Sequence, residues 1–354
     1  MVLHLFPAEK FTVAYVKKIH ELFDEKNHIF IIFGEQRSEY HLEEIKKMDH
    51  VLFTQTITNL GSEFDYYVET CSIMICHSLF FKLIDLYKIN RLVKIYKKKI
   101  AWVIWGKDLY EDYEKSKRLK AHFMIKPIIK ESIRKSFISK VSIFITAGDY
   151  DALKKRYQIS PNVKVLNAQY TYDFIDLIEK KQNEKVNIMV GHSATETCRH
   201  LETFEMLKDY VGKVRIFCPM SYPADKEYVE IISNRGEEIF GHDFIAITNF
   251  MKYEDYIYFL NTIDIGIFNN SRQQGMGNVT NLLYLGKKVY LSRDNTIRKS
   301  YKKDEYTIFD CDEIGRDDFL LPLADDQILN NRNNVVYKFS DENLYKEWRL
   351  VFES

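Results

Sequence analysis

Short runs of β-branched and aromatic residues alternate with amphipathic helical patterns along the first half of the chain. Apolar runs of this length, bounded by polar or turn-forming residues, are typical of buried strands. The predicted strands are Val2–Phe6, His28–Gly34, Val51–Thr56, Ser72–His77, Ala101–Trp105 and Val141–Thr146. The predicted helices are Thr12–Asp24, Leu79–Lys98 and Asp149–Tyr157.

The same alternation starts again after the charged segment Glu179–Lys185. Its predicted strands are Val186–Gly191, Val214–Pro219, Asp243–Thr248, Asp264–Phe268, Lys288–Ser292 and Tyr306–Asp310, and its predicted helices are His200–Tyr210, Lys226–Glu238, Tyr253–Thr262, Val279–Leu285 and Thr296–Lys303. Two such series predict an α/β protein with two Rossmann-like domains, each built on a doubly wound parallel sheet. We expect domains at residues 1–165 and 166–338, followed by a C-terminal helix within 339–354.

Composition and charge narrow the class of protein. The chain has 354 residues, 46% of them hydrophobic, with 51 basic and 51 acidic side chains, so its overall charge does not point to nucleic acid. No apolar run approaches the ~18 residues of a membrane span, and the first ten residues lack the apolar core of a signal peptide. The five cysteines are scattered without a zinc-like spacing, which indicates reduced thiols in ordinary core positions.

The balanced charge conceals a basic region at residues 82–140. Apolar residues are interleaved with its cations, as on surfaces that rest on anionic lipid headgroups. The cations include Arg91, Lys94, Lys97, Lys98, Lys99, Lys117, Arg118, Lys120, Lys126, Lys130, Arg134 and Lys135. A solvated helix face over an apolar core stripe is the alternative interpretation.

Candidate ligand-binding segments follow strands of the second domain. Ligands of doubly wound sheets bind outside the carboxyl ends of the strands, and a cleft between two such domains is the default site. Gly191–Thr197 follows the first of these strands. Gly191 allows close backbone approach, and Ser193, Thr195 and Thr197 are suited to cap the next helix. A helix N-terminus there would bind a diphosphate, although a plain capped helix has the same pattern.

The segment Arg272–Asn278 lies between a predicted strand and a predicted helix. Its residues Gly275 and Gly277, either side of Met276, let backbone amides approach an anion, and Arg272 offers a planar fork for phosphate oxygens. Gln273, Gln274 and Asn278 can donate hydrogen bonds to phosphate or sugar oxygens. The spacing matches neither a dinucleotide fingerprint nor a P-loop. A third segment with Pro219, Ser221 and Tyr222 would frame a nucleotide base, or is a simple turn.

The first domain offers two candidates for a general base that activates an acceptor hydroxyl. Asp108, in the segment Trp105–Asp108, is the first choice, and the alternative is that it caps the following segment. His77, at the end of a predicted strand, is the second choice. The triplets Asp149–Asp151 and Asp310–Asp312 resemble metal-binding pairs, but their positions favour an incidental origin, so we expect no required metal or other cofactor.

The chain resembles glycosyltransferase family 56, whose characterised activity belongs to the assembly of enterobacterial common antigen. The resemblance covers nearly the whole chain, and His192 stands where the family pattern has asparagine. It rests on His4–Pro7, Glu9–Thr12, Gly191–Thr197, His200–Glu202, Pro219–Tyr222, Phe240–Gly241, Arg272–Asn278 and Leu283–Tyr290. It implies the GT-B fold, in which two Rossmann-like domains face each other across a cleft, with the donor in the second domain and the acceptor at the first. It also implies that the C-terminal helix packs back on the first domain.

The family resemblance further implies a TDP-linked dideoxy-amino sugar, similar to N-acetylfucosamine, as donor. The implied acceptor is a polyprenyl-diphosphate-linked saccharide at the cytoplasmic face of the inner membrane, where region 82–140 would contact the surface as part of a peripheral protein. Three alternatives remain at this stage. They are a transferase with another nucleotide sugar such as a UDP-sugar, a sugar-nucleotide 2-epimerase, and a non-catalytic scaffold that binds nucleotide sugars.

Overall fold

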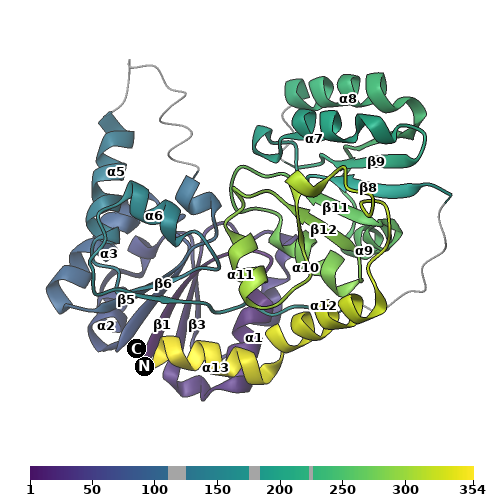
Figure 1. Ribbon diagram of the computed structural model, residues 1–354. Helices are drawn as coiled ribbons and strands as arrows, with labels where there is room; N and C mark the ends of the chain where they lie inside the picture. The colour runs from purple at the N-terminus through teal and green to yellow at the C-terminus, as the bar shows by residue number, and fades with distance from the viewer. Residues whose placement is uncertain (111–124, 175–183, 223–225) are drawn as a thin grey trace. The chain divides into compact units, whose positions relative to one another are not determined.

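The chain forms two compact units, each with its own parallel sheet (Figure 1). The computed structural model describes residues 1–110, 125–174, 184–222 and 226–354. The N-terminal unit comprises Met1–Tyr172 and Phe339–Ser354, and the C-terminal unit comprises Asp173–Lys338. The first boundary therefore lies after Tyr172 rather than after residue 165. The reason is an additional strand, Lys164–Leu166, which pairs with the first sheet and holds the following residues beside it.

The sheet of the N-terminal unit has the order β3-β2-β1-β4-β5-β6-β7, and all its strands are parallel. The six predicted strands are present, with ends that differ by a few residues. The seventh was not predicted because two of its three residues are exposed, so it makes no apolar run. The strands are β1 (Val2–Pro7), β2 (His28–Phe33), β3 (Val51–Thr54), β4 (Ile73–His77), β5 (Lys99–Val103), β6 (Ile143–Ile145) and β7 (Lys164–Leu166).

Helices cover both faces of this sheet, because alternate residues of each strand point to opposite sides. One apolar cluster joins the sheet to α2, α3, α5 and α6 through residues such as Phe64, Leu86 and Phe137. The other joins it to α1 and α13 through Tyr15 and Trp348. The helices are α1 (Thr12–Leu22), α2 (Gly61–Thr70), α3 (Leu83–Tyr96), α5 (Ile125–Ile138), α6 (Tyr150–Arg156) and α13 (Asp341–Phe352).

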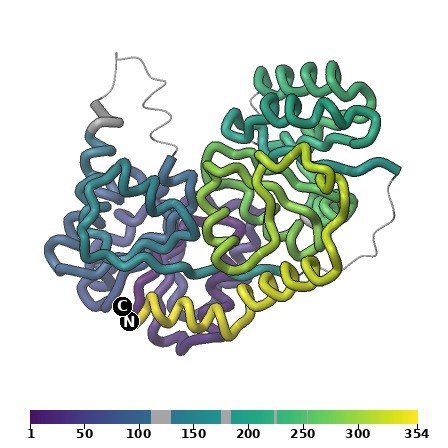
Figure 2. Tube along the Cα trace, viewed as in Figure 1, coloured from purple at the N-terminus to yellow at the C-terminus, as the bar shows by residue number. Residues whose placement is uncertain are grey.

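The two ends of the chain lie at the amino edge of the first sheet (Figure 2). The Met1 carbonyl accepts a hydrogen bond from the Ser72 amide at 2.8 Å, just before β4. The Ser354 carbonyl accepts one from Lys99 Nζ at 2.6 Å, at the start of the neighbouring β5. Helix α13 thus packs on the N-terminal unit.

The sheet of the C-terminal unit has the order β10-β9-β8-β11-β12-β13, which is the 3-2-1-4-5-6 order of the Rossmann fold. The strands are β8 (Val186–Val190), β9 (Val214–Pro219), β10 (Phe244–Ile247), β11 (Ile265–Phe268), β12 (Lys288–Leu291) and β13 (Phe309–Asp310). The helices are α7 (His200–Leu207), α8 (Lys226–Phe240), α9 (Tyr253–Thr262), α10 (Met276–Tyr284), α11 (Ile297–Lys303) and α12 (Asp325–Lys338).

The strand order of the C-terminal unit reverses direction between β8 and β11. The chain adds strands outward on one side from β8 and then returns to add β11 on the other. The loops that leave these two neighbouring strands diverge, and the crevice between them is where ligands of doubly wound sheets bind. The fold therefore places one candidate site at the carboxyl ends of β8 and β11.

Candidate donor site

The three candidate segments of the C-terminal unit lie at one edge of its sheet. Gly191–Thr197 follows β8, Pro219–Tyr222 ends and follows β9, and Arg272–Asn278 follows β11. Strands β9, β8 and β11 are neighbours, so their carboxyl ends meet at this edge. The Ala194 amide donates to the Tyr222 carbonyl at 3.2 Å, which joins the first two segments. Gly191–Thr197 thus lies between Pro219–Tyr222 and Arg272–Asn278 along this edge.

Gly191 makes the sharp exit from β8. Its φ of +68° lies in the left-handed region, and a Cβ at this position would sit 2.6 Å from His200 Nε2. The Gly191 amide still donates to the Ile267 carbonyl of β11 at 2.9 Å. Only glycine accommodates this turn without moving the buried His200 side chain.

The hydroxyls that follow Gly191 do not cap the next helix, which corrects the sequence prediction. Helix α7 begins only at His200, after a short 3-10 turn over Glu196–Cys198 and the left-handed residue Arg199. No side chain caps α7. The hydroxyls of Ser193, Thr195 and Thr197 instead turn inward, and the Thr195 hydroxyl lies 3.1 Å from each of the other two. They shape the loop rather than present a helix N-terminus to an anion.

Cys198 lies at the centre of this hydroxyl cluster. Its thiol is fully buried, with Ser193 Oγ and Thr195 Oγ1 each at 3.4 Å and His192 Nδ1 at 3.7 Å. Burial raises the pKa of the thiol. The hydrogen bond and charge of His192, with the two hydroxyls, outweigh burial and lower this pKa to about 6. Sequence reasoning missed Cys198, because its pattern is that of an ordinary core thiol.

The segment after β11 is hydrogen-bonded to the segment after β8. The Gln274 amide nitrogen donates to Cys198 Sγ at 3.2 Å, and its amide oxygen accepts from the Thr197 hydroxyl at 3.0 Å. The Ser271 amide donates to the Thr197 carbonyl at 2.9 Å. Gly275 has a φ of +74°, and its absent Cβ would lie 3.0 Å from His192 Nδ1. The two segments therefore form one structure.

Helix α10 begins within these two joined segments, and the backbone N–H groups of its first turn have no partner within the helix. Gly275 precedes its first residue, Met276, and no side chain caps it. The first-turn amides of Met276, Gly277 and Asn278 have no partner within the helix, and the helix dipole favours negative charge beside them. A Cβ at Gly277 would meet no atom within 4 Å, so the space beside that backbone is open. A helix start of this kind suits an anion, and the approach of an anion to the backbone amides of Arg272–Asn278 stays a prediction.

Polar side chains around the start of α10 complete the site. Arg272 is half-buried, and Gln273 Nε2 donates to Met276 Sδ at 2.6 Å. Asn278 Oδ1 accepts from the Tyr256 hydroxyl at 2.9 Å, which leaves its amide hydrogens to donate elsewhere. The amide oxygens of Gln273 and of Asn270 are buried and accept no hydrogen bond within the described part of the chain. Asn270, which sequence reasoning missed, is a second buried acceptor without a donor among the described residues.

The third segment has an exposed aromatic ring. Pro219 is buried at the end of β9, Ser221 is partly exposed, and the Tyr222 ring is 63% exposed. An exposed tyrosine face beside the start of the first segment suits stacking on a nucleotide base. Its role as a base contact stays a prediction.

The structure does not support Asp108 as a general base. Its carboxylate is buried, and both oxygens are occupied. Oδ2 accepts from Trp102 Nε1 at 2.8 Å and from the Leu79 amide at 3.1 Å, and Oδ1 accepts from the Trp105 amide at 3.0 Å. Burial raises the pKa of Asp108, although Arg134 and these donors oppose the rise. Asp108 therefore holds the loops after β4 and β5 together.

His77 is also buried and belongs to a chain of hydrogen-bonded side chains. Its Nδ1 lies 2.8 Å from the Tyr170 hydroxyl, and its Nε2 lies 3.2 Å from His4 Nδ1. His4 Nε2 is in turn 3.0 Å from His28 Nδ1, and Trp105 Nε1 donates to the Tyr170 hydroxyl at 2.9 Å. If every ring is neutral, each of these four contacts can pair one donor with one acceptor. Burial lowers the pKa of His77 well below its usual value, so this ring is a structural group and not an exposed base.

The aspartate triplets are engaged within their own surroundings. Asp149 Oδ1 accepts from the Tyr110 hydroxyl at 2.9 Å, and Asp151 pairs with Lys154 at 3.2 Å. Asp310 pairs with Arg298, and Asp312 pairs with Arg293 at 2.9 Å. These contacts fit the incidental origin expected from the sequence. Metal independence itself stays a prediction.

Comparison with known proteins decides the family. Residues 73–354 match the family described as 4-alpha-L-fucosyltransferase, glycosyl transferase group 56. The chain belongs to this family. The match includes all three candidate segments of the C-terminal unit, so the candidate site lies within the region that matches the family.

Solved structures share the fold at low sequence identity. HepE of Anabaena, in complex with UDP and glucose, is 10% identical with a TM-score of 0.64, and the alignment covers 99% of each chain. A glycosyltransferase from Rickettsia africae is 13% identical with a TM-score of 0.67, covering 99% of this chain and 97% of that one. Sucrose-phosphate synthase from Thermosynechococcus elongatus is 9% identical with a TM-score of 0.63, covering 99% and 98%. The protein is thus a glycosyltransferase of the GT-B type.

Proposed function

We propose that this family 56 enzyme transfers an N-acetylfucosamine-like dideoxy-amino sugar from a TDP-sugar to a polyprenyl-diphosphate-linked saccharide during synthesis of cell-surface polysaccharide. The observation that carries the proposal is the uncapped N-terminus of α10 at the reversal point of the C-terminal sheet, with Arg272 beside it. Amides and a guanidinium at this edge suit a nucleoside diphosphate.

The charge that develops during transfer falls on the diphosphate. As the acceptor hydroxyl oxygen bonds to the sugar C1 and its proton passes to water, the bond from C1 to the diphosphate oxygen breaks and its electron pair stays on the leaving nucleoside diphosphate. The amides of Met276–Asn278 and the Arg272 guanidinium are positioned in advance to stabilise that charge, which is the largest catalytic contribution in such sites. Ser193 and Thr195 contribute by holding the neighbouring loop. The buried acceptors on Asn270 and Gln273 suit sugar hydroxyl or acetamido N–H donors.

A stacked Tyr222 accepts any nucleotide base, so it does not select the base of the donor. HepE, which shares the fold, binds UDP. A UDP-sugar is therefore the direct competitor to a TDP-sugar as donor. Comparing the two donors at equal concentration separates these cases.

The membrane part of the proposal rests on the outer face of α3, which we define as Ile84, Tyr87, Arg91, Lys94 and Ile95. Their spacing puts them on one stripe of the helix, and the three apolar side chains are 55–60% exposed. Apolar and cationic residues on one exposed stripe suit an anionic bilayer surface. The enzyme would then act as a peripheral protein at the cytoplasmic face of the inner membrane. Among the described residues, no helix has both the length and the apolarity to span a bilayer.

Two cations of the basic region 82–140 are engaged in hydrogen bonds within the N-terminal unit. Arg134 is buried and donates to the Asp108 carbonyl, and Lys98 donates to the Glu69 and Cys71 carbonyls at 2.6 and 2.8 Å. These two hold the fold together. Lys117, Arg118, Lys120 and the side chain of Lys126 lie outside the described residues.

Vesicle flotation tests the α3 face. Reversing Arg91 and Lys94 to glutamate should weaken binding to phosphatidylserine-containing vesicles at least about thirtyfold, since each cation near such a surface contributes about 1 kcal/mol. The matched control reverses Lys226 and Lys303, which are exposed on the C-terminal unit. Equal loss in both double variants would point to net charge alone and contradict the α3 assignment.

The transfer reaction itself is tested with purified enzyme, a TDP-linked and a UDP-linked dideoxy-amino sugar, and a prenyl-diphosphate-linked saccharide. We expect glycosylated lipid from the TDP-sugar, with the same yield in EDTA. Turnover of the donor alone to an epimer would show an isomerase. Nucleotide binding without any turnover would show a scaffold.

A further inference from the structure

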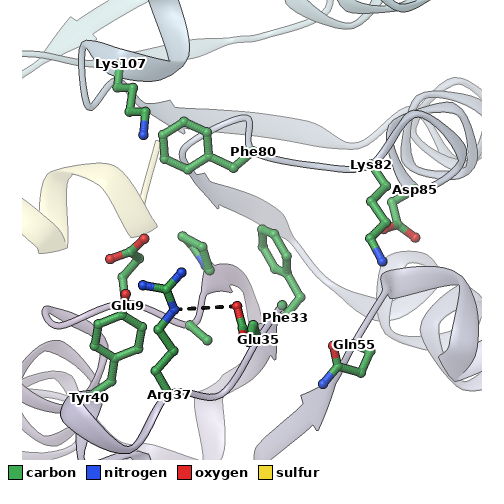
Figure 3. A pocket seen from close by; sticks show the side chains of 13 residues that line it. Glu9, Phe33, Glu35, Arg37, Tyr40, Gln55, Phe80, Lys82, Asp85 and Lys107 are labelled. Atoms are coloured by element: carbon green, nitrogen blue, oxygen red, sulfur yellow. Dashed lines mark ion pairs between the residues drawn. The ribbon is translucent and has the colours of Figure 1, made fainter. Parts of the chain in front are cut away.

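The N-terminal unit has a pocket at the reversal point of its own sheet (Figure 3). Its strand order β3-β2-β1-β4-β5-β6-β7 reverses between β1 and β4. The pocket is lined by the residues that leave these strands and their neighbours, and it encloses about 270 Å³. Pockets for small ligands start at about 300 Å³, so this one holds a group the size of a sugar unit. All of its lining residues belong to the N-terminal unit.

The chain leaves β1 in a fixed conformation at the base of this pocket. The buried Thr12 hydroxyl donates to the Pro7 carbonyl at 2.9 Å and accepts from the Glu9 amide at 3.1 Å. The Ala8 amide donates to the Phe33 carbonyl of β2 at 2.8 Å. These bonds fix the backbone of Glu9 before any ligand arrives, which is the preorganisation that a binding residue needs.

Three carboxylates line the pocket, and two of them are already engaged. Glu35 pairs with Arg37 at 3.5 Å, as the dashed line in Figure 3 shows. Asp85 is buried and accepts from the Thr58 amide at 2.8 Å. The Glu9 side chain has no ion pair or hydrogen bond with another described residue. Glu9 is therefore the pocket carboxylate whose acceptor oxygens remain available to a ligand.

The rest of the lining matches the two surfaces of a sugar ring. Phe33, Tyr40 and Phe80 provide aromatic surface for its C–H groups, and Figure 3 shows Phe80 between Lys107 and the region of Glu9 and Arg37. Arg37 and Lys82 provide hydrogen-bond donors for hydroxyl, carbonyl or anionic oxygens. Three basic and three acidic side chains balance the charge of the lining, which suits a polar neutral group better than a free polyanion.

We infer that this pocket binds the terminal sugar of the acceptor, with Phe80 packed on the ring and Glu9 accepting a hydrogen bond from one of its hydroxyls. The inference rests on the proposed transferase function. The inference places the acceptor at Glu9 and Phe80, whereas the sequence pointed to Asp108 or His77 as the residue beside the acceptor hydroxyl. Lys82 and Asp85 belong to the start of α3, whose outer face carries the proposed membrane contact, so one helix links the sugar pocket to the lipid surface.

Tryptophan fluorescence tests the pocket without relying on transfer. The only tryptophans, Trp102, Trp105 and Trp348, all belong to the N-terminal unit, and the Trp105 ring lies 6.0 Å from Phe80. Titration with a prenyl-diphosphate-linked disaccharide, its chain short enough to stay in water, should give a saturable change. Glu9→Gln and Phe80→Ala should each weaken this binding at least tenfold. Glu43→Gln, which removes an exposed carboxylate of the same unit, should bind as wild type does.

The outcomes separate the pocket from the proposed function. Wild-type binding that neither Glu9→Gln nor Phe80→Ala weakens, or no saturable binding at all, would overturn the pocket assignment. Binding that behaves as expected, without sugar transfer from any nucleotide sugar, would support the pocket and refute the transferase proposal. Thermal stabilisation by TDP, which reports the C-terminal unit, should be the same in all these variants.

Discussion

Gln274 and Cys198, 76 residues apart in the chain, are joined by a hydrogen bond of 3.2 Å from the glutamine amide to the cysteine sulfur. This contact ties the loop after β11 to the loop after β8. It sets the distance between the start of α10 and the hydroxyl cluster on the other side of the candidate diphosphate site. The geometry of donor binding therefore depends on two side chains that need not touch the donor.

Removing either partner should weaken nucleotide binding. We expect Gln274→Ala and Cys198→Ala each to raise the Kd for TDP about fivefold to thirtyfold, because each leaves a buried polar partner unsatisfied at a cost of roughly 1–2 kcal/mol. The double variant should be little worse than either single one, since the same contact is lost. Isothermal titration calorimetry measures the Kd for TDP, and Gln158→Ala, a substitution of an exposed glutamine, is the control. Fully additive effects would show that the two side chains act separately.

Gly275 and Gly277 should respond differently to alanine. Gly275 is left-handed and faces His192, so Gly275→Ala should lower the free energy of unfolding by about 1–2 kcal/mol and also weaken TDP binding. Gly277 has open space around it in the first turn of α10. Gly277→Ala should leave the fold intact, or stabilise it by about 0.5 kcal/mol, yet weaken TDP binding because the new methyl group occupies the approach to the backbone. Unchanged TDP affinity in Gly277→Ala would argue against a diphosphate at these amides.

Asp108→Asn should act on stability rather than on chemistry. An amide cannot accept all three hydrogen bonds that the carboxylate receives, so the unfolding free energy of the N-terminal unit should fall by about 1–3 kcal/mol. The transfer rate of the folded variant, and its dependence on pH, should stay close to wild type. Chemical denaturation followed by tryptophan fluorescence measures the unfolding free energy, and transfer kinetics at several pH values measure the rate and its pH dependence. A loss of rate beyond a hundredfold at unchanged stability would restore Asp108 as the base.

The histidine chain makes the N-terminal unit sensitive to acid. Burial lowers the pKa of His28 to about 4, and it holds the pKa values of His4 and His77 well below their usual range. The unfolded histidines, with pKa near 6.5, bind protons that the folded ones exclude, so the stabilisation is complete above pH 6.5 and is lost as the pH falls toward 4. Each histidine contributes up to about 1.4 kcal/mol per pH unit in that window. Tryptophan fluorescence during urea titration at several pH values measures the slope.

The control for this pH dependence is His242, whose side chain is 89% exposed. His242→Gln should leave the slope unchanged. An unfolding free energy of the N-terminal unit that is constant between pH 6.5 and 5 would contradict the neutral histidine chain.

Most strands and the parallel, doubly wound character of the two sheets follow from the pattern of apolar runs, because parallel strands are buried on both faces. Strand β7 and helices α2, α5 and α12 escaped prediction. Lys164–Leu166 is largely exposed, Gly61–Thr70 has only Phe64 and Val68 as buried apolar residues, and Asp325–Lys338 has only Val335. Ile125–Ile138 lies in the cation-rich region 82–140. The segments after β8 and β11 were predicted as ligand-binding strand ends, and the observed sheet order places these two strands side by side.

The contacts inside the candidate site could not be predicted from the sequence. Pairs such as Thr197 with Gln274 are set by how two loops pack, and no periodicity reports that. Asp108 had the residue type and position of a base, but its three donors come from the packing of Trp102, Leu79 and Trp105 around it. Glu9 was noticed only as part of a resembling segment, because its role depends on the pocket that forms around it.

The most direct test of the account is thermal unfolding of the purified protein with TDP, UDP or GDP, each with and without EDTA, for wild type and Arg272→Ala. A ligand at a hundredfold its Kd stabilises by about 2.7 kcal/mol, which raises the melting temperature clearly. We predict that TDP stabilises wild type equally in EDTA, that UDP and GDP stabilise it less, and that Arg272→Ala loses most of the effect. Absence of stabilisation by every nucleotide, or full stabilisation of Arg272→Ala, would contradict a donor site at the start of α10.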